Sequence, residues 1–322
     1  MLKYVARKMI ILIPKMLIIS LIIFFALQAL PGDAITRTIP PEQYANMTEA
    51  QINDLKESAG LNSPMLIQYF SWIGKILHGD FGYSQVNGSN IGKMLATRLP
   101  FTFELAFWAL IIANILGLLM GFLAAVKKNS AIDYTCTTFS VIGISVPDFF
   151  FGIVFILIFA LKLKWFPTGG RMSAGDTDFL SRIKYLVLPA ACLSVSLLAT
   201  LTRYTRGSML DILNKDYIKT ARSKGLSEIS VNIKHGFRNA LTPVMTLLVL
   251  RIPMLVSGTV VIETVFNYSA MGGTILNAIS GGDMTVVMIT TMICSFVVLL
   301  ASFLVDILTA LLDPRVRLDY GG

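Results

Sequence analysis

The chain has 322 residues, of which 55% are hydrophobic and only 14% are charged, and its mean hydropathy is +0.70. These values exclude an ordinary water-soluble domain and indicate a protein that crosses a membrane several times. The net charge of +8 could suit nucleic acid, but the basic residues lie beside apolar stretches and form no separate basic domain. We therefore expect membrane lipid, and no nucleic acid, as the partner of this charge.

Several apolar stretches are long enough to cross the hydrocarbon layer, which takes roughly 20 residues of helix because a span must satisfy its own backbone hydrogen bonds. We predict an all-α integral membrane protein. Its six transmembrane helices are expected at Met9–Leu30, Thr102–Val126, Thr135–Leu161, Tyr185–Leu201, Pro243–Phe266 and Thr285–Leu312. The fourth is short and could tilt little. The first is longer than a signal-peptide core and lacks a small-residue cleavage site after it, so we interpret it as a retained anchor.

The domain organisation follows from these spans. An N-terminal transmembrane helix occupies residues 1–30, and residues 31–100 have mixed polarity with turn signals such as Asn87-Gly88. We predict that this second stretch is an extracytoplasmic insertion. Residues 101–312 are then a five-helix core with a cytoplasmic loop at 203–242, and residues 313–322 are a cytoplasmic tail.

The orientation is predicted from the lysines and arginines in short loops, which favour the cytoplasm. They gather at the N-terminus, after the second and fourth spans, and at the C-terminus, for example at Arg7, Lys127, Arg206 and Arg315. Both termini are therefore expected in the cytoplasm. Several basic residues of the third loop oppose this rule locally, at Lys162, Lys164, Arg171, Arg182 and Lys184.

No catalytic or metal-binding pattern is evident. Each of Cys136, Cys192 and Cys294 lies in a different apolar span, with no paired cysteine or histidine nearby. The stretch 88–94 resembles a phosphate loop, but its spacing is one residue short and Met94 replaces the hydroxyl residue that would hold magnesium. We expect this chain to bind no ATP, magnesium or other metal itself.

Two small-residue patterns favour helix packing. Gly117 and Gly121 are four apart in the second span, which lets another helix approach closely, and we expect that helix to belong to the same chain. The sequence Gly143-Ile-Ser145 resembles the core of an intramembrane serine protease, but neither histidine of the chain lies in a span to act as its base. Hydrolysis is therefore not expected.

The loop at 203–242 has the pattern of a short amphipathic helix. From Met209, the apolar residues Leu213, Tyr217 and Ala221 recur four apart, while the lysines and arginines point elsewhere. A membrane protein that keeps such a polar, cationic segment can present it to a soluble partner. The alternative is an interfacial helix held by the charge of lipid headgroups.

Three residues predict the ends of the helices in this loop. Gly225 can adopt the left-handed conformation that closes a helix, and Ser227 can cap the next one. Pro243 is expected in the first turn of the fifth span. Together they predict a rigid helix-turn-helix at the membrane surface.

In this loop and in several further motifs, the chain resembles the permease subunits of type I ABC importers, in the dipeptide, oligopeptide and nickel group. The loop sequence D-Y-I-K-T-A-R-S-K-G-L followed by H-G-F-R-N-A-L-T-P matches the segment with which that group docks on its ATPase. Further motifs of the group occur in order: L-P-G-D at 30–33, H-G-D-F-G-Y-S at 78–84, R-L-P-x-T-x-E-L at 98–105, L-P-A at 188–190, E-T-V-F at 263–266 and L-L-D-P-R at 311–315.

The resemblance implies the type I importer permease fold in a bacterial cytoplasmic membrane. It implies three kinds of partner: a homologous second permease, two ABC ATPases that bind ATP and Mg, and an extracytoplasmic substrate-binding protein. The substrate would be dipeptides or oligopeptides, with nickel chelates or glutathione-like solutes as the alternative. The residues of the docking motif would couple the permease to the ATPase: Asp216, Tyr217, Thr220, Ala221, Lys224, Gly225 and Leu226.

The translocation pathway is predicted from ionisable residues inside spans, because such residues are costly there and usually face a cavity or a partner. They are Asp148, Arg251, Glu104 and Glu263. Asp148 and Arg251 could line the route of a peptide, which carries one charge of each sign, or they could simply pair with each other. Near Arg251 the chain departs from the small glycine-rich residues common in the family, which leaves the substrate open.

Two other classes remain as alternatives. An ion-coupled secondary transporter or channel would also use buried charges, but the sequence contains no inverted repeat and no pair of matching broken helices. A purely structural membrane scaffold would leave Asp148 and Arg251 unexplained.

Overall fold

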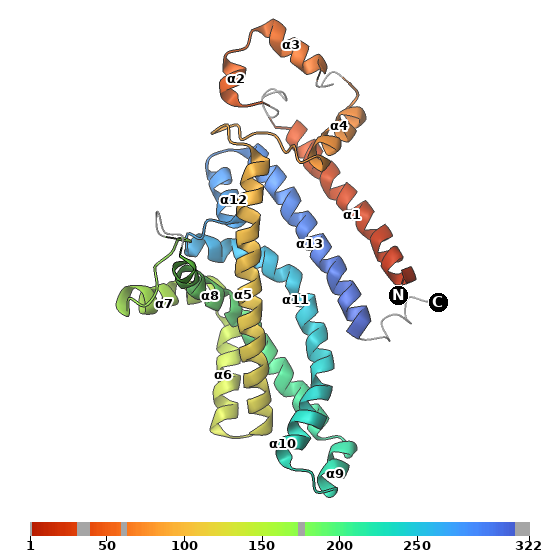
Figure 1. Cartoon of the computed structure of the whole chain (residues 1–322), viewed down its shortest axis with the longest axis vertical. Coiled ribbons are helices and arrows are strands. Elements are labelled where there is room, and N and C mark those ends of the chain that lie inside the picture. The colour runs from red at the N-terminus through yellow and green to blue at the C-terminus, as the bar shows by residue number, and fades with distance from the viewer. Residues whose placement is uncertain (1, 31–38, 59–62, 173–177, 313–322) are drawn as a thin grey trace. The chain divides into compact units, whose positions relative to one another are not determined.

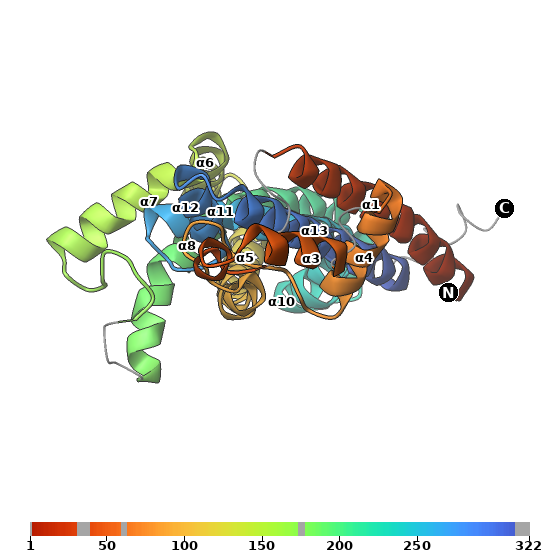
Figure 2. The same cartoon turned by 90° about the horizontal axis from the view of Figure 1, so that it is seen from above.

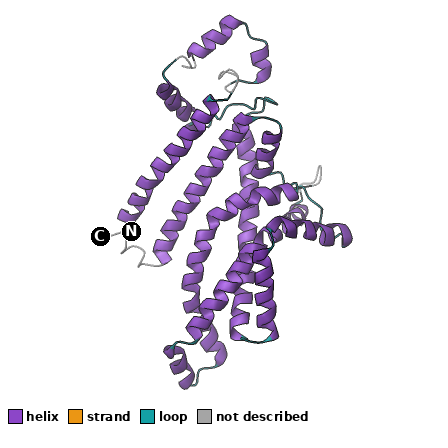
Figure 3. Ribbon diagram, turned by 180° about the vertical axis from the view of Figure 1, so that it is seen from behind, coloured by secondary structure: helices purple, strands orange, loops and turns teal. Residues whose placement is uncertain are grey.

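A computed structural model describes residues 2–30, 39–58, 63–172 and 178–312, apart from some side chains in these ranges. The regular elements of this part of the chain are all helical, and its extended pairing is one isolated bridge between Tyr83 and Asn90 (Figure 3). The all-α prediction is confirmed. The bridge closes the turn predicted at Asn87-Gly88, where Gly88 has a φ of +67°.

The chain divides into two compact units, and each is described by itself. One contains residues 7–102 and 269–300, and the other contains residues 1–6, 103–268 and 301–322. The first unit therefore combines most of the N-terminal helix and the predicted insertion with a segment near the C-terminus.

Apolar packing holds the first unit together. Its helices are most of α1 (Leu2–Gln28), α2 (Pro41–Ala45), α3 (Glu49–Ser58), α4 (Met65–Leu77), the start of α5 (Ile91–Val126), α12 (Met271–Ser280) and the first part of α13 (Met284–Leu312). Its buried core includes Leu27, Ile91, Met271 and Met292. Tyr69 of α4 packs on Phe24 of α1 and shares a hydrogen bond of 2.7 Å with the Ser20 hydroxyl. The described part of residues 31–100 therefore contains the short helices α2, α3 and α4, the turn closed by the Tyr83–Asn90 bridge, and the start of α5.

The second unit is built around the long helix α8 (Phe179–Leu213), which packs against α6, α7 and α11. Its further elements are α6 (Ala131–Ser145), α7 (Asp148–Phe155), the π-helix η2 (Ile156–Lys162), α9 (Asp216–Ser223), α10 (Glu228–Ser230), the π-helix η3 (Val231–Phe237) and α11 (Arg238–Val265). Figure 1 shows α9 and α10 at the same end of this unit as the α5–α6 turn. The basic residues of that turn, Lys127 and Lys128, therefore share an end with the predicted docking loop.

Two glycines bring α5 close to α8. A Cβ atom on Gly117 would lie 2.8 Å from the Cβ of Leu201, and one on Gly121 would lie 2.6 Å from the Cβ of Thr205. Contacts this short leave no room for a side chain, so the helices approach backbone to backbone. The prediction that these glycines serve packing within the chain is confirmed.

The third predicted span, Thr135–Leu161, is not one continuous helix. It consists of α6 and then α7 with η2, which meet at an angle of 108° (Figure 2). Val146 between them is extended, with φ −95° and ψ 131°. Pro147 explains the break, because its ring disfavours the helical conformation of the residue before it.

The other long helices extend beyond their predicted bounds. Helix α5 begins at Ile91 instead of Thr102 and includes Pro100, and α8 covers Phe179–Leu213 instead of Tyr185–Leu201. A hydrophobic window marks the part of a helix that suits hydrocarbon, while the helix itself can continue into water. The short fourth span was therefore an underestimate.

Four helices of the described chain are long and apolar enough to cross a membrane, and the bent pair α6–α7 would make five. The fifth predicted span corresponds to α11, in which the side chains of residues 249–258 lie outside the described part. The total of six spans remains a prediction.

Candidate functional site

Helix α9 forms the first half of the predicted docking loop and is held from one side. Its buried residues are Ile218 and Ala221, which pack against Val231 of η3 together with Ile212 and Leu213 at the end of α8. This apolar contact fixes α9 on the helix that leads into it and on the one that follows.

Gly225 ends α9 as the sequence predicts. Its φ is +78°, which an L side chain rarely adopts. Its N–H donates to the carbonyl of Arg222 at 2.9 Å, and the N–H of Leu226 donates to the carbonyl of Ala221 at 3.4 Å. This pair of hydrogen bonds is the Schellman motif, in which a left-handed residue lets the last carbonyls of a helix find donors.

The second half of the loop begins at Ser227, whose side chain accepts a hydrogen bond of 3.4 Å from the N–H of Ser230. The predicted cap is confirmed. Helix α10 then continues through η3 into α11 at Arg238. The prediction that Pro243 occupies the first turn of the fifth span is wrong, because the helical path starts at the Ser227 cap and is already established before the proline.

The outer face of the loop carries most of the predicted coupling residues. Asp216, Thr220 and Lys224 are exposed, and Tyr217 and Leu226 are 45% and 42% exposed. Ala221 differs, because it is 7% exposed and belongs to the buried contact with η3. The predicted coupling residues therefore lie together around one turn, but Ala221 faces the interior of the loop while the others are exposed.

Ion pairs on this face differ in geometry. Arg222 contacts Glu228 through two hydrogen bonds, of 2.9 and 3.2 Å, and so ties α9 to α10. Lys219 and Asp216 are 2.9 Å apart, but their side chains are 70% and 94% exposed, so this pair contributes little to stability.

Next to the loop, a second apolar cluster connects η3 and the end of α8 to the long helices α5 and α11. Met209 of α8, Ala240 of α11 and Ala125 of α5 are buried together. Phe122 of α5 packs on Phe237 with ring centroids 5.4 Å apart. This cluster and the buried contact of α9 share Ile212 and Leu213 at the end of α8.

A buried ion pair links α6 to α8 near this end, and sequence reasoning missed it. The Nε of Arg206 lies 2.5 Å from one oxygen of Asp133, and Nη2 lies 2.8 Å from the other. Asp133 also accepts a hydrogen bond of 2.9 Å from the N–H of Asn129, which has a φ of +60°. An acidic residue directly after the basic α5–α6 turn was the available signal, but its partner is distant in sequence.

Among the predicted pathway residues, Glu104 has cationic partners. Its carboxylate lies 2.7 Å from Arg182 and 3.9 Å from Arg171. The phenol of Tyr268, in the turn after α11, is buried near them. Burial raises the pKa of Tyr268 to about 12, and the negative charge of Glu104 adds to this effect, while Arg171 opposes it. The hydroxyl therefore keeps its proton at physiological pH.

The other pathway residues lie apart from this cluster in the sequence. Asp148 is the first residue of α7 and half-buried, and its carbonyl accepts a hydrogen bond of 3.1 Å from the thiol of Cys192. Glu263 in α11 is fully buried. The side chain of Arg251 lies outside the described part, so the predicted pair with Asp148 remains a prediction.

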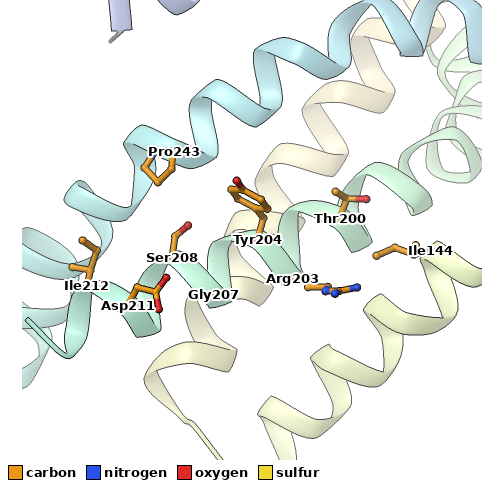
Figure 4. A pocket seen from close by; sticks show the side chains of 9 residues that line it. All are labelled: Ile144, Thr200, Arg203, Tyr204, Gly207, Ser208, Asp211, Ile212 and Pro243. Atoms are coloured by element: carbon orange, nitrogen blue, oxygen red, sulfur yellow. The ribbon is translucent and has the colours of Figure 1, made fainter. Parts of the chain in front are cut away.

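A groove of about 650 Å³ runs along the end of α8 that leads into α9. Figure 4 shows it between α8, which supplies most of its lining, and single residues of α6 and α11, Ile144 and Pro243. Its walls combine apolar side chains with one acidic and one basic residue, Asp211 and Arg203.

Comparison with solved structures identifies the fold. The helical arrangement is similar to that of the MetNI methionine ABC transporter in inward-facing conformations, with a TM-score of 0.55 and 16% sequence identity, covering 68% of this chain and 96% of the other. The fold is that of a type I ABC importer permease.

Sequence comparison identifies the family. Residues 114–318 match the family described as "Binding-protein-dependent transport system inner membrane component", and residues 1–106 match its N-terminal component. The chain belongs to this family. It is a permease subunit of an ABC importer, a multi-span protein of the bacterial inner membrane, and the ion-coupled transporter considered above is set aside.

Three curated relatives match over 98% of this chain and 99% of their own length. The oligopeptide transport system permease protein AppB of Bacillus subtilis is 39% identical. The di/tripeptide transport system permease protein DppB of Pseudomonas aeruginosa and the glutathione transport system permease protein GsiC of Escherichia coli are each 33% identical.

Proposed function

We propose that this chain forms the route through which an ABC importer moves dipeptides or oligopeptides into the cell by alternating access. The observation that carries the proposal is the full-length similarity to permeases named for oligopeptide and di/tripeptide transport. A homologous second permease would complete the route, and an extracytoplasmic binding protein would deliver the substrate. Two partner ATPases would bind ATP and Mg and hydrolyse the ATP.

Helix α9 would couple this chain to an ATPase. Two exposed apolar side chains, Tyr217 of α9 and Leu226 in the turn after it, suit a groove on a soluble partner, while Asp216, Thr220 and Lys224 supply polar contacts around them. Ala221 and Gly225 would act inside the loop, Ala221 by packing on η3 and Gly225 by its left-handed backbone. ATPase closure would then move α9, and the packed cluster around Met209 would pass the motion to the spans.

In the proposed topology both termini and α9 lie in the cytoplasm, and residues 31–100 lie outside. The clustering of basic residues supports this arrangement, since the α5–α6 turn and α9 share one end of their unit. Asp148, Arg251, Glu104 and Glu263 would line or brace the pathway. The ion pairs of Glu104 favour bracing for that residue.

Glutathione is a second candidate substrate, because one full-length relative is a glutathione permease. Glutathione is itself a tripeptide, so the same route could accept its backbone charges. Nickel chelates remain an outcome of the uptake assay.

Co-purification tests the proposal most simply. The chain would be tagged at its C-terminus, extracted gently from native membranes, and its partners identified by mass spectrometry. We expect a second six-span permease and ABC ATPases in stoichiometric amounts, and a substrate-binding protein under cross-linking. Recovery of the chain alone in several mild detergents would contradict the proposed assembly.

A further inference from the structure

The groove along α8 contains a polar stripe with helical spacing. Counted from the first of them, its residues occupy positions i, i+3, i+4, i+7, i+8 and i+11 and therefore share one face of the helix: Thr200, Arg203, Tyr204, Gly207, Ser208 and Asp211. The opposite face carries Leu201, Thr205 and Met209, which are all buried. At this end of α8, one face is therefore buried in the core, and the opposite, polar face lines the groove.

Two opposite charges lie on the open face without an ion-pair partner among the described residues. Arg203 and Asp211 are both exposed, and both line the groove. Asp211 follows Arg203 by eight positions, which corresponds to a rise of about 12 Å along a helix. Opposite charges this far apart do not neutralise each other, so both remain available to a ligand.

Gly207, between the two charges, has no close packing neighbour at its Cβ position among the described residues. A Cβ atom built on it would meet nothing within 4 Å. A glycine in a helix interior costs about 1 kcal/mol relative to alanine, and no contact of the described residues offsets that cost. Its missing side chain deepens the groove midway between Arg203 and Asp211.

We propose that this groove is a subsite for the backbone of a short zwitterionic peptide, with the carboxylate at Arg203 and the ammonium group at Asp211. The inference rests on the proposed function and names a place where the transported substrate is held. An extended chain covers about 3.3–3.6 Å per residue, so a separation of about 12 Å suits three or four residues. Tyr204 and Ser208 lie between the two charged residues along the helix and line the same groove, so their hydroxyls can bond to peptide groups.

The apolar part of the groove fits a substrate of variable side chains. Ile144 on one side and Pro243 on the other offer contact area without hydrogen-bonding groups. Such walls accept many side chains, whereas the two charges recognise what all peptides share. The subsite adjoins the start of α9, so its occupancy is close to the coupling helix in the chain.

The test uses the complete importer in proteoliposomes with ATP and labelled trialanine as the probe. Arg203→Gln and Asp211→Asn should each lower trialanine uptake at subsaturating concentration about tenfold, as expected for loss of a charged hydrogen bond. The exposed residues Lys127→Gln and Asp54→Asn serve as matched controls and should leave uptake unchanged. The exchange Arg203→Asp with Asp211→Arg should recover part of the uptake, because a peptide can then bind in the reverse direction.

Thiol labelling at Gly207→Cys provides the independent readout. A water-soluble thiol reagent should modify this cysteine in the assembled complex beyond the level of the parent protein, and trialanine should protect it. Absence of labelling would mean that the second permease covers this face, and would overturn the subsite. Normal uptake by both single variants would overturn the subsite but not the proposed peptide import. A parent complex that imports no peptide would overturn the subsite and the proposed function together.

Discussion

Arg206 of α8 and Asp133 of α6 form an ion pair with two hydrogen bonds, of 2.5 and 2.8 Å, at the end of the unit that carries α9. Asp133 is only 2% exposed. Removal of one partner of a buried pair leaves a charge without compensation, which is more costly than removal of both. The pair therefore fixes the position of α6 relative to the helix that leads into the docking loop.

The first prediction concerns this pair. Asp133→Ala should lower the free energy of unfolding by about 3 kcal/mol. The double variant with Arg206→Ala should be less destabilised than the sum of the two single variants. Thermal unfolding of the detergent-solubilised complex measures both effects, and simple additivity would show that the two side chains do not act as a pair.

The second prediction concerns the backbone at Gly225. Valine at a φ of +78° should introduce strain on the order of 1–3 kcal/mol and misplace the outer face of α9, although the surrounding space is open. We expect Gly225→Val to insert normally and to hydrolyse ATP in the complex without uptake. Gly225→Asn is the matched control, since asparagine tolerates the left-handed region, and it should retain coupling. Normal uptake by the valine variant would refute the coupling role.

Glu104 allows a bracing role to be separated from a pathway role. Glu104→Gln removes the charge that holds Arg182 and Arg171 and should destabilise the protein by about 1–2 kcal/mol, less than a fully buried pair because Arg182 is 41% exposed. Substrate preference should stay unchanged. Uptake competition among peptides of different charge measures this preference, with the exposed Glu57→Gln as control. A changed preference at normal stability would identify Glu104 as a pathway residue.

Gly121 should tolerate no side chain. A Cβ atom would lie 2.7 Å from the carbonyl oxygen of Thr202, so Gly121→Ala should destabilise the protein by about 1–3 kcal/mol. Gly74 in α4 is the matched control, because its Cβ position is empty and alanine there should be neutral or stabilising. Equal thermal unfolding of the two variants would contradict the close contact of α5 with α8.

Arg251 tests the proposed pathway. If its cation contacts the carboxylate of a passing peptide, Arg251→Gln should lower uptake of trialanine more than uptake of trialanine amide, which lacks that charge. Lys128→Gln is the exposed control. A variant that keeps both uptake and preference would make the pathway role untenable.

Local signals allowed the sequence to predict where the helices of the loop at 203–242 end and begin. A glycine with positive φ and a serine cap act through their own and adjacent backbone groups, so Gly225 and Ser227 could be interpreted without knowledge of the rest of the chain. The long apolar stretches likewise predicted membrane helices, because hydrocarbon imposes their length and polarity.

Contacts between distant helices were beyond such reasoning. Asp133 and Arg206, or Glu104 and Arg182, are separated by more than seventy residues, and nothing in their local sequence names the partner. The helix break before Pro147 could have been predicted, because proline restricts the conformation of the residue before it. Hydropathy alone, however, predicts one continuous helix in this region. The burial of Ala221 also depended on η3, which no local pattern indicated.

Peptide uptake driven by ATP through this chain is the central claim, and it can be measured directly. We would reconstitute the complete complex in proteoliposomes, add ATP on the α9 side, and measure labelled trialanine on that side with and without the binding protein. The account predicts uptake that requires both ATP and the binding protein, and that is lost in Gly225→Val while ATP hydrolysis continues. Uptake by this chain without ATPases, driven by an ion gradient, would contradict it.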